Sequence, residues 1–256
     1  MKTNGKGSKV LAFCLTLLMA VGLFGTTAFA IDSSDTGMIT VSDVEDSVTV
    51  SAYRLMDVKV NENGQPQEPV YTWVDAAASW VRTNYSAYIG TGTDNSVQAA
   101  FSTASAENIA AFYDALAAAI KTTNNPLNIP VAGTCTGSGS IASLTMGNYL
   151  ILIENGMRVY RPSAVNLVPE WKETEWVMSD ATIEVKSSEP TITKTVNGKE
   201  ADNASIGDTV SFVIVTDVPQ FPENAPAKNY AVSDILPDGL TRTGSIRVSG
   251  VTGTAS

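Results

Sequence analysis

The chain has 256 residues, a formal net charge of −10, 44% hydrophobic residues and no histidine. The acidic balance argues against nucleic acid as a partner, because phosphate binding requires a basic surface. The absence of histidine removes the usual general base, the most common metal ligand and every Ser-His or Cys-His nucleophile pair. We therefore expect no metal site, no cofactor and no conventional enzyme activity.

Residues 1–30 predict a signal peptide. Three lysines in the first nine residues precede an apolar run at residues 10–24, and Ala28-Phe29-Ala30 has the small-x-small pattern of a signal peptidase site. The apolar run is too short to be a good membrane span. We therefore expect a mature chain that begins at Ile31, is exported, and has no membrane segment after the signal is removed.

The mature chain is strongly acidic and has a single cysteine. Without the three lysines of the signal peptide, 13 basic residues remain against 26 acidic ones, so the formal charge moves from −10 to −13. Cys14 lies in the removed segment, so Cys135 can form no intramolecular disulfide. We expect Cys135 to be a packed or loop residue, because no histidine can activate it. An exported chain without disulfides needs another source of stability.

Residues 31–187 predict a first domain of β type. Its strands are expected at residues 38–41, 47–58, 140–145, 148–154, 164–168 and 181–185. In the second of these, Val48, Val50 and Ala52 alternate with polar or small neighbours, and a turn at residues 154–156 joins two later strands. The glycine-rich residues 133–139 resemble a loop, since no strand, helix and lysine follow in the order of a phosphate-binding loop.

A helical insertion is predicted within this domain, at about residues 74–122. Alanine-rich segments predict helices at residues 74–88 and 96–122. Apolar residues recur at helical spacing in the second helix, at Ile109, Phe112, Leu116 and Ile120. Asn124-Asn125-Pro126 is expected to end it. Because these helices lack a basic face, we expect them to pack on the sheet and not to bind a membrane.

Residues 188–256 predict a second, partial domain, which follows a short linker at residues 187–190. Its strands are expected at residues 191–196, 209–218, 230–236 and 244–251, with turns at Asn197-Gly198 and Pro237-Asp238-Gly239. This spacing favours an immunoglobulin-like sandwich. Such a sandwich needs further strands, so residue 256 is interpreted as a fragment end.

Two charged residues of the second domain have the parity of core positions. Lys194 alternates in phase with Ile192 and Val196, and Asp234 alternates in phase with its apolar neighbours two and four positions away. Charges in a core are costly unless they meet or react. The ordinary alternatives are a lysine that snorkels at a strand end and an aspartate that belongs to the following turn.

Four segments resemble the major, shaft-forming pilins of Gram-positive bacteria. They are residues 51–56 (SAYRLM), 190–196 (PTITKTV), 206–210 (IGDTV) and 230–240 (YAVSDILPDGL). The resemblance covers most of the mature chain and is most specific from residue 186 to residue 240. It implies Cna-type, immunoglobulin-like sandwich domains, polymerisation by a sortase, and stiffening by internal Lys-Asn isopeptide bonds.

The resemblance implies that Lys194 is the amine of such a bond and that Asp234 is its acid. Burial favours a neutral amine, which can attack a carboxamide, and a protonated carboxyl, which can shuttle the proton as ammonia leaves. The asparagine partner is expected on the last strand of the domain. The asparagines of the second domain lie in predicted turns or loops, at Asn197, Asn203, Asn224 and Asn229. We therefore expect the partner to lie beyond residue 256.

Lys186 has the opposite predicted orientation. The strand at residues 181–185 turns Ile183 and Val185 inward, so Lys186 faces solvent. The resemblance places here the lysine that attacks the sortase acyl-enzyme and joins one subunit to the next. The family motif has Tyr-Pro before that lysine, where this chain has Glu-Val. Lys172 and Lys199 are therefore alternative linkage sites, and an ordinary solvated lysine is the other interpretation.

The first domain offers no comparable pair. No lysine precedes Lys59 in the mature chain, and Lys59 follows the first clear predicted strand. An internal bond to Asn166 is a weak candidate.

The sequence thus predicts a secreted structural subunit of a covalent pilus on the cell surface, with self-crosslinking chemistry but no turnover. Its expected partners are a pilin sortase, identical subunits, accessory pilins and host or bacterial surface ligands. One alternative is an accessory or tip adhesin that binds through the insertion at residues 73–122. The other is an exported carbohydrate-active enzyme with Glu170, Glu173 and Glu175 as its acids, although their position beside two tryptophans is more typical of a solvated loop.

Overall fold

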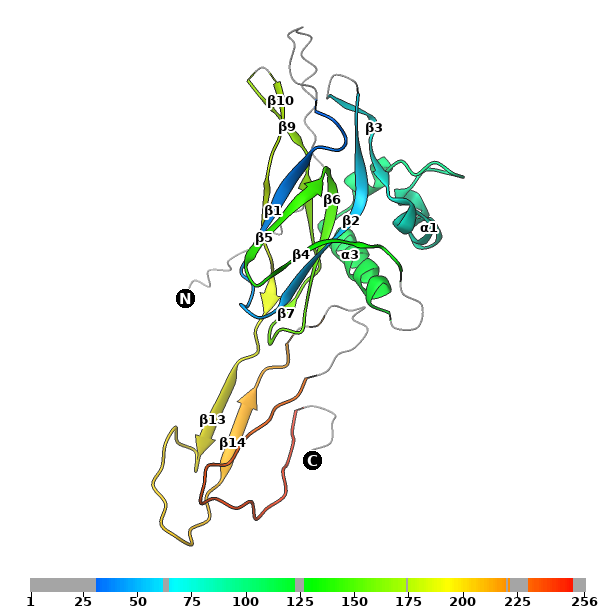
Figure 1. The fold of residues 1–256 in the computed structure, drawn as a ribbon. Coiled ribbons are helices and arrows are strands. Elements are labelled where there is room, and N and C mark those ends of the chain that lie inside the picture. The colour runs from blue at the N-terminus through cyan, green and yellow to red at the C-terminus, as the bar shows by residue number, and fades with distance from the viewer. Residues whose placement is uncertain are drawn as a thin grey trace, which may run out of the picture.

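The computed structural model describes residues 31–61, 65–122, 127–173, 175–219, 221 and 230–250. The predicted signal peptide and the predicted helix stop at residues 124–126 lie outside the described residues. Within them the fold is mainly β, as predicted, and the strands form several sheets (Figure 1).

Two sheets face each other in the first part of the chain. The first sheet has the order β3 (Pro66–Trp73), β2 (Thr49–Val60), β6 (Gly147–Glu154) and β8 (Ser163–Leu167), and β4 (Val131–Thr136) also pairs with β2. The second sheet has the order β11 (Ala181–Glu184), β1 (Thr36–Ser42) and β5 (Gly139–Thr145). β1 runs parallel to β11 and antiparallel to β5.

The sandwich core fills the space between these two sheets. It consists of Ile39, Val41, Val44, Val48, Val50, Ala52, Ile141, Leu144, Tyr149, Ile151, Ile153, Tyr160, Val165, Leu167 and Val185. Three residues predicted to face inward belong to it and are at most 2% exposed: Val48, just before β2, and Val50 and Ala52 within β2. The predicted β-sandwich is therefore confirmed for this part of the chain.

The first sheet is covered on both faces. Residues 147–153 of β6 are all buried, which is the pattern of a strand between two apolar layers. Tyr149, Ile151 and Ile153 face the sandwich core, whereas Leu150 and Leu152 face a second cluster, the helix-side core. Other members of the helix-side core include Leu55, Met56, Trp73, Ala77, Val81, Phe101, Phe112 and Leu116.

The helices supply that second layer. They are α1 (Asp75–Asn84), the 3-10 helix η1 (Ser86–Tyr88), α2 (Ala99–Ser102) and α3 (Ala106–Lys121), and they lie between β3 and β4 in the chain (Figure 1). The predicted position of the helical insertion is thus confirmed. No helix among the described residues is long and apolar enough to cross a membrane.

The single helix predicted at residues 96–122 is wrong, because α2 and α3 are separate. Ser105 precedes α3 as its N-cap, and its Oγ accepts the N–H of Asn108 at 3.2 Å. A serine that caps a backbone N–H favours a helix start over a helix interior. The alanine-rich pattern continues on both sides of Ser105, so the N-cap was not recognised from the sequence.

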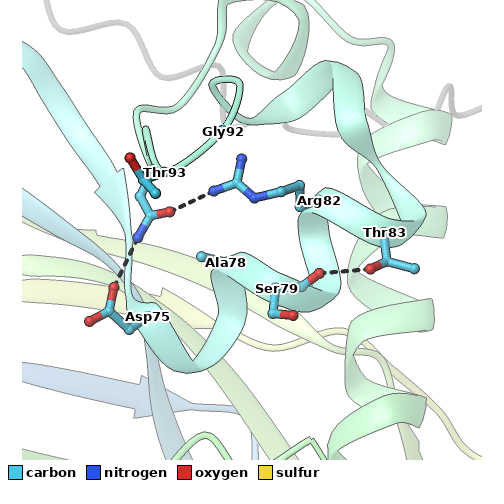
Figure 2. A pocket seen from close by; sticks show the side chains of 8 residues that line it. Asp75, Ala78, Ser79, Arg82, Thr83, Gly92 and Thr93 are labelled. Atoms are coloured by element: carbon cyan, nitrogen blue, oxygen red, sulfur yellow. Dashed lines mark hydrogen bonds between the residues drawn. The ribbon is translucent and has the colours of Figure 1, made fainter.

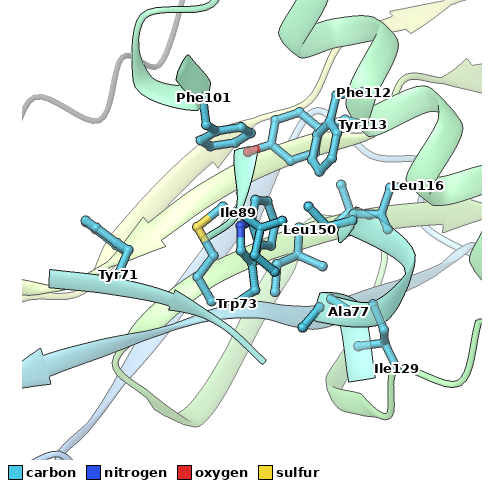
Figure 3. Packing of buried hydrophobic residues seen from close by; sticks show 14 of the residues in the cluster. Tyr71, Trp73, Ala77, Ile89, Phe101, Phe112, Tyr113, Leu116, Ile129 and Leu150 are labelled. Carbon is cyan, nitrogen blue, oxygen red and sulfur yellow. The ribbon is translucent and has the colours of Figure 1, made fainter. Parts of the chain in front are cut away.

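Phe112 is the centre of an aromatic cluster in the helix-side core (Figure 3). Its ring centroid lies 4.9–6.0 Å from those of Trp73, Trp80, Tyr85, Tyr88, Phe101 and Tyr113. Edge-to-face contacts of this kind add stability beyond the burial of area. Phe112 and Leu116 are fully buried, and Ile109 and Ile120 pack at the margin, so the predicted inward face of this helix is confirmed.

β3 and β4 occupy segments where no strand was predicted. β3 contains two prolines and a glutamate, and therefore lacks the alternation that identifies a strand. β4 takes up most of the predicted loop at residues 133–139. A Cβ at Gly133 would lie 2.5 Å from Cγ2 of Ile141 in β5, so the glycine permits a close crossing of two strands and is not a loop signal here.

The predicted solvated loop at residues 170–175 is also wrong. Its flanks form a hairpin of β9 (Pro169–Lys172) and β10 (Glu175–Met178). Trp171 stands opposite Trp176, with 5.5 Å between the ring centroids. A cross-strand aromatic pair stabilises such a hairpin, and this outweighs the solvated character of the three acids.

The second part of the chain contains one strand pair among the described residues. β13 (Ile192–Val196) runs antiparallel to β14 (Phe212–Thr216). The predicted turn at Asn197-Gly198 is confirmed, since both residues have positive φ. The strands predicted at residues 230–236 and 244–251 are not formed at the described positions, because a strand needs a backbone partner and none pairs with them there.

Glu45 ties the β1–β2 connection to the chain that follows β6. Its carboxylate accepts the N–H groups of Met157 and Arg158 and the hydroxyl of Tyr160, each at 3.1 Å. The Tyr160 oxygen in turn accepts the N–H of Glu45 at 3.0 Å. Burial by itself raises the pKa of Glu45. The hydrogen bonds from these donors lower it by more than burial raises it, so the pKa lies below its ordinary value.

Removing the centre of the aromatic cluster should destabilise the fold strongly. We expect Phe112→Ala to lower the free energy of unfolding by about 3–5 kcal/mol, because a buried aromatic ring leaves a cavity. Ile120→Ala, on the same helix but partly exposed, serves as the control and should cost less than half as much. Urea denaturation measures both, and equal losses would contradict the central role of Phe112.

The Glu45 contacts should make stability depend on pH. Because the folded pKa is lowered, this stabilisation is present above the ordinary glutamate pKa of 4.5 and is lost as pH falls through the folded value. We expect Glu45→Gln to cost about 1–2 kcal/mol at pH 7 and progressively less in acid. Urea denaturation across pH measures this, with the exposed neighbour variant Asp46→Asn as control. A pH-independent difference would rule the interpretation out.

Candidate functional site

Lys194 lies in the middle of β13, directly opposite Ile214 of β14. Residues opposite each other in an antiparallel pair share a face, so Lys194 lies on the same face as Ile192, Val196 and Phe212. Its Nζ is 4.7 Å from the centroid of the Phe212 ring, close enough for a cation–π contact. The amine is thus held over an apolar surface, on the face that strand alternation predicted.

Asp234 meets this lysine from 40 residues further along the chain. Lys194 Nζ donates to Asp234 Oδ1 at 2.7 Å. The side chains are 37% and 30% exposed, so the pair is partly solvated here and not enclosed in a core as expected. The reason is that β13 and β14 pair only with each other among the described residues, so no further strand covers the contact.

An amine beside a carboxyl can exchange a proton with it, and a crosslink would need a carboxamide as the third group. Asn197 does not fill this role, since its Nδ2 donates to Asp202 at 2.9 Å and its Oδ1 accepts the N–H of Ser211 at 2.9 Å. Asn203 is exposed between the strands, while Asn224 and Asn229 lie outside the described residues. The asparagine partner therefore stays a prediction.

Lys186 is exposed, as its parity predicted. Val185 before it is 2% exposed and belongs to the sandwich core, and Ile183 packs against that core. The two alternative linkage lysines are also exposed: Lys172 on β9, and Lys199 in an ion pair with Asp202 at 3.0 Å. Lys186 differs from both because it directly follows a buried residue of the sandwich.

The chain around Lys186 is fixed by a short ladder. β12 (Ser187–Ser188) pairs with β7 (Val159–Tyr160), and the Lys186 carbonyl accepts the N–H of Arg161 at 2.9 Å. Beside this ladder, the Arg158 guanidinium bonds to Asp43 at 3.1 Å and pairs with Glu189 at 3.4 Å. Sequence reasoning missed Arg158, because its two partners are more than 30 residues away from it in the chain and no local pattern connects them.

The first part of the chain brings no lysine to Asn166. The Asn166 Oδ1 accepts Nδ2 of the buried Asn148 at 2.7 Å. Lys59 lies within β2 and not after it as predicted, because the strand extends to Val60, and its side chain is exposed. Cys135 is half-buried in β4, and burial raises the pKa of its thiol, which favours the unreactive form.

The helical insertion carries an open hollow beside α1 (Figure 2). Its one cation, Arg82, donates to the carbonyl of Gly90 and to Oδ1 of Asn95, the latter at 2.8 Å. Asn95 also donates to Asp75 at 2.9 Å. These contacts tie the loop that follows η1 to α1.

The acids of the enzyme alternative belong to a single hairpin. On the β9–β10 hairpin, Glu175 stands opposite Lys172 and Glu170 stands opposite Val177. Glu170 accepts the hydroxyl of Ser179 at 2.8 Å. Among the described residues, no group of three or more Cys, Asp or Glu side chains is arranged to hold a metal ion.

Comparison with known proteins gives one relative by sequence. No family model matches the chain. The trypsin-resistant surface T6 protein of Streptococcus pyogenes serotype M6 is 26% identical over 245 residues, which cover 89% of this chain and 41% of that protein. The chain therefore spans about two fifths of the length of the curated relative that it matches.

Two solved structures are also similar. The T6 backbone pilin of S. pyogenes aligns with a TM-score of 0.44 and 17% identity, over 76% of this chain and 38% of that one. The major pilin SpaD of Corynebacterium diphtheriae aligns with a TM-score of 0.34 and 16% identity, over 75% and 39%. By sequence, the chain is thus similar to a surface protein of Streptococcus pyogenes.

Proposed function

We propose that this chain belongs to a structural shaft subunit of a covalently polymerised pilus on the cell surface. The observation that carries the proposal is the contact between Lys194 and Asp234, two residues 40 positions apart that meet at 2.7 Å within the segment most similar to major pilins. The relative is named for its trypsin resistance, a property expected of a crosslinked surface subunit.

Residues 31–187 and 188–256 would form two domains of this subunit. The first has a closed apolar core, whereas the second has large apolar residues on its surface, with Ile192 at 58% and Val215 at 61% exposure. In a completed sandwich, further strands would cover these side chains and the Lys194–Asp234 pair. That cover would dehydrate both charges and favour their neutral forms.

An isopeptide bond would then form at Lys194. The neutral amine attacks the side-chain carbon of an asparagine, a new C–N bond forms, and the asparagine nitrogen leaves as ammonia. Asp234 lies within hydrogen-bond distance of the amine, where it can pass the proton that the amine loses to the leaving group. The bond would replace the disulfide that the cysteine content excludes.

Lys186 would provide the bond between subunits. A pilin sortase holds one subunit as an acyl-enzyme, and the Lys186 amine of the next subunit attacks that acyl carbon, so that an amide forms and the enzyme thiol leaves. The role requires an exposed amine on a fixed backbone, and both conditions are met at this position. Accessory pilins and surface ligands are further proposed partners.

The internal bond predicts a defined mass loss. The full-length mature protein should be lighter than its sequence mass by one ammonia, about 17 Da. Lys194→Ala and Asp234→Ala should both restore the full mass, whereas Lys199→Ala, an exposed lysine at the adjacent turn, should keep the loss. Intact-mass spectrometry measures this, and a loss that persists in Lys194→Ala would refute the assignment.

The linkage role predicts loss of polymer when Lys186 is replaced. Lys186→Arg keeps the charge but removes the primary amine, so incubation with the pilin sortase should give no covalent ladder on a denaturing gel. Lys172→Arg and Lys199→Arg should polymerise normally. If Lys186→Arg still polymerises, the linkage site is elsewhere. If the unmodified protein never polymerises, the result favours the alternative of an accessory or tip pilin.

A further inference from the structure

Lys186 is anchored through its backbone on both sides. Before it, the Val185 N–H donates to the Ser42 carbonyl at 3.3 Å, and the Val185 side chain is buried in the sandwich core. After it, Ser187 stands opposite Tyr160 in the β7–β12 ladder. The backbone position of Lys186 is therefore set by contacts at its neighbours.

The ladder on the far side of Lys186 is too short to hold by itself. β7 and β12 contribute two residues each, and such short ribbons are marginal in water. β7 is held from the other end, because Glu45 accepts the N–H of Arg158 and the hydroxyl of Tyr160. Ser187 and Ser188 of β12 are half-buried, and Glu189 after them is exposed.

Arg158 links the segment after β12 to the β1–β2 connection. Its Nη1 bonds to Asp43 in the β1–β2 connection, and its Nε lies 3.4 Å from Oε2 of Glu189, just after β12. The guanidinium thus joins three segments: the β1–β2 connection, β7 and the linker. Its side chain is 29% exposed, compared with 68% for Glu189, so the Arg158 end of the contact is the more buried one.

We propose that Arg158 is a positioning residue for acyl transfer to Lys186: through Glu189 it fixes the linker, and the fixed linker presents the Lys186 amine in one orientation. This inference rests on the proposed linkage role of Lys186. A nucleophile held in a productive orientation loses less freedom on reaching the acyl-enzyme, so its effective concentration is higher. Surface ion pairs are weak, so the expected effect is on presentation of the amine and not on global folding.

The test uses this chain as the amine acceptor, with a pilin sortase and a short LPxTG-type peptide as acyl donor. The readouts are the rate of adduct formation at Lys186, located by peptide mass spectrometry, and amide hydrogen exchange at Arg161 and across residues 186–189. Arg158→Met and Glu189→Gln each remove the contact. Arg158→Lys keeps the charge but lacks the planar fork. Glu184→Gln is the matched control, because it removes an acid two positions from Lys186, compared with three for Glu189, that forms no ion pair among the described residues.

We expect Arg158→Met and Glu189→Gln to raise the KM for the acceptor about three- to tenfold with little change in kcat, because only the fraction of molecules with a competent orientation binds productively. Amide exchange at Arg161 and the linker should accelerate, while the thermal unfolding midpoint stays the same. Arg158→Lys should recover part of the loss, and Glu184→Gln should behave like the unmodified chain.

Three results would overturn the inference. If the unmodified chain forms an adduct at Lys186 and both contact variants react with the same KM, Lys186 keeps its role and Arg158 has none. If Glu184→Gln raises KM as much as Glu189→Gln, local charge is responsible and not the contact. If the unmodified chain forms no adduct at Lys186, the linkage role itself fails and the inference fails with it.

Discussion

The burial of β6 on both faces is the constraint on which the rest of this structure depends. One face of β6 packs into the sandwich core and the other packs into the helix-side core. Without both layers, one apolar face of the first sheet would be exposed to water. β1 and β11 are positioned by the sandwich layer, with Val185 buried at its end. Because Val185 is buried in the sandwich core, the next residue, Lys186, faces solvent just after β11.

The second part of the chain does not bury its apolar strand faces in this way among the described residues. The described residues after 188 contain one strand pair with apolar side chains on its surface, and a lysine and an aspartate that meet beside them. A noncovalent ion pair at this exposure contributes little to stability. A covalent bond formed later at Lys194 would explain why this pair lies on the apolar face of β13.

Those parts of the fold and of the candidate site that depend on a local residue pattern could be predicted from the sequence. Alternation identified β2, helical spacing identified Phe112 and Leu116, and parity predicted that Lys194 and Asp234 both face inward, where they meet. The failures have physical reasons: Gly133 is in a strand because it permits a close crossing, and Ser105 starts a second helix. Arg158 escaped prediction because Asp43 and Glu189 meet it only after the sandwich has folded.

The central claim is that Lys194 becomes part of a covalent bond, and a high-resolution crystal structure of the full-length mature protein tests it most directly. The account predicts Lys194 Nζ bonded to an asparagine side-chain carbon at about 1.33 Å, with a planar amide and the Asp234 carboxyl within hydrogen-bond distance of it. A free Lys194 ammonium that contacts only Asp234, inside a completed sandwich, would contradict the account.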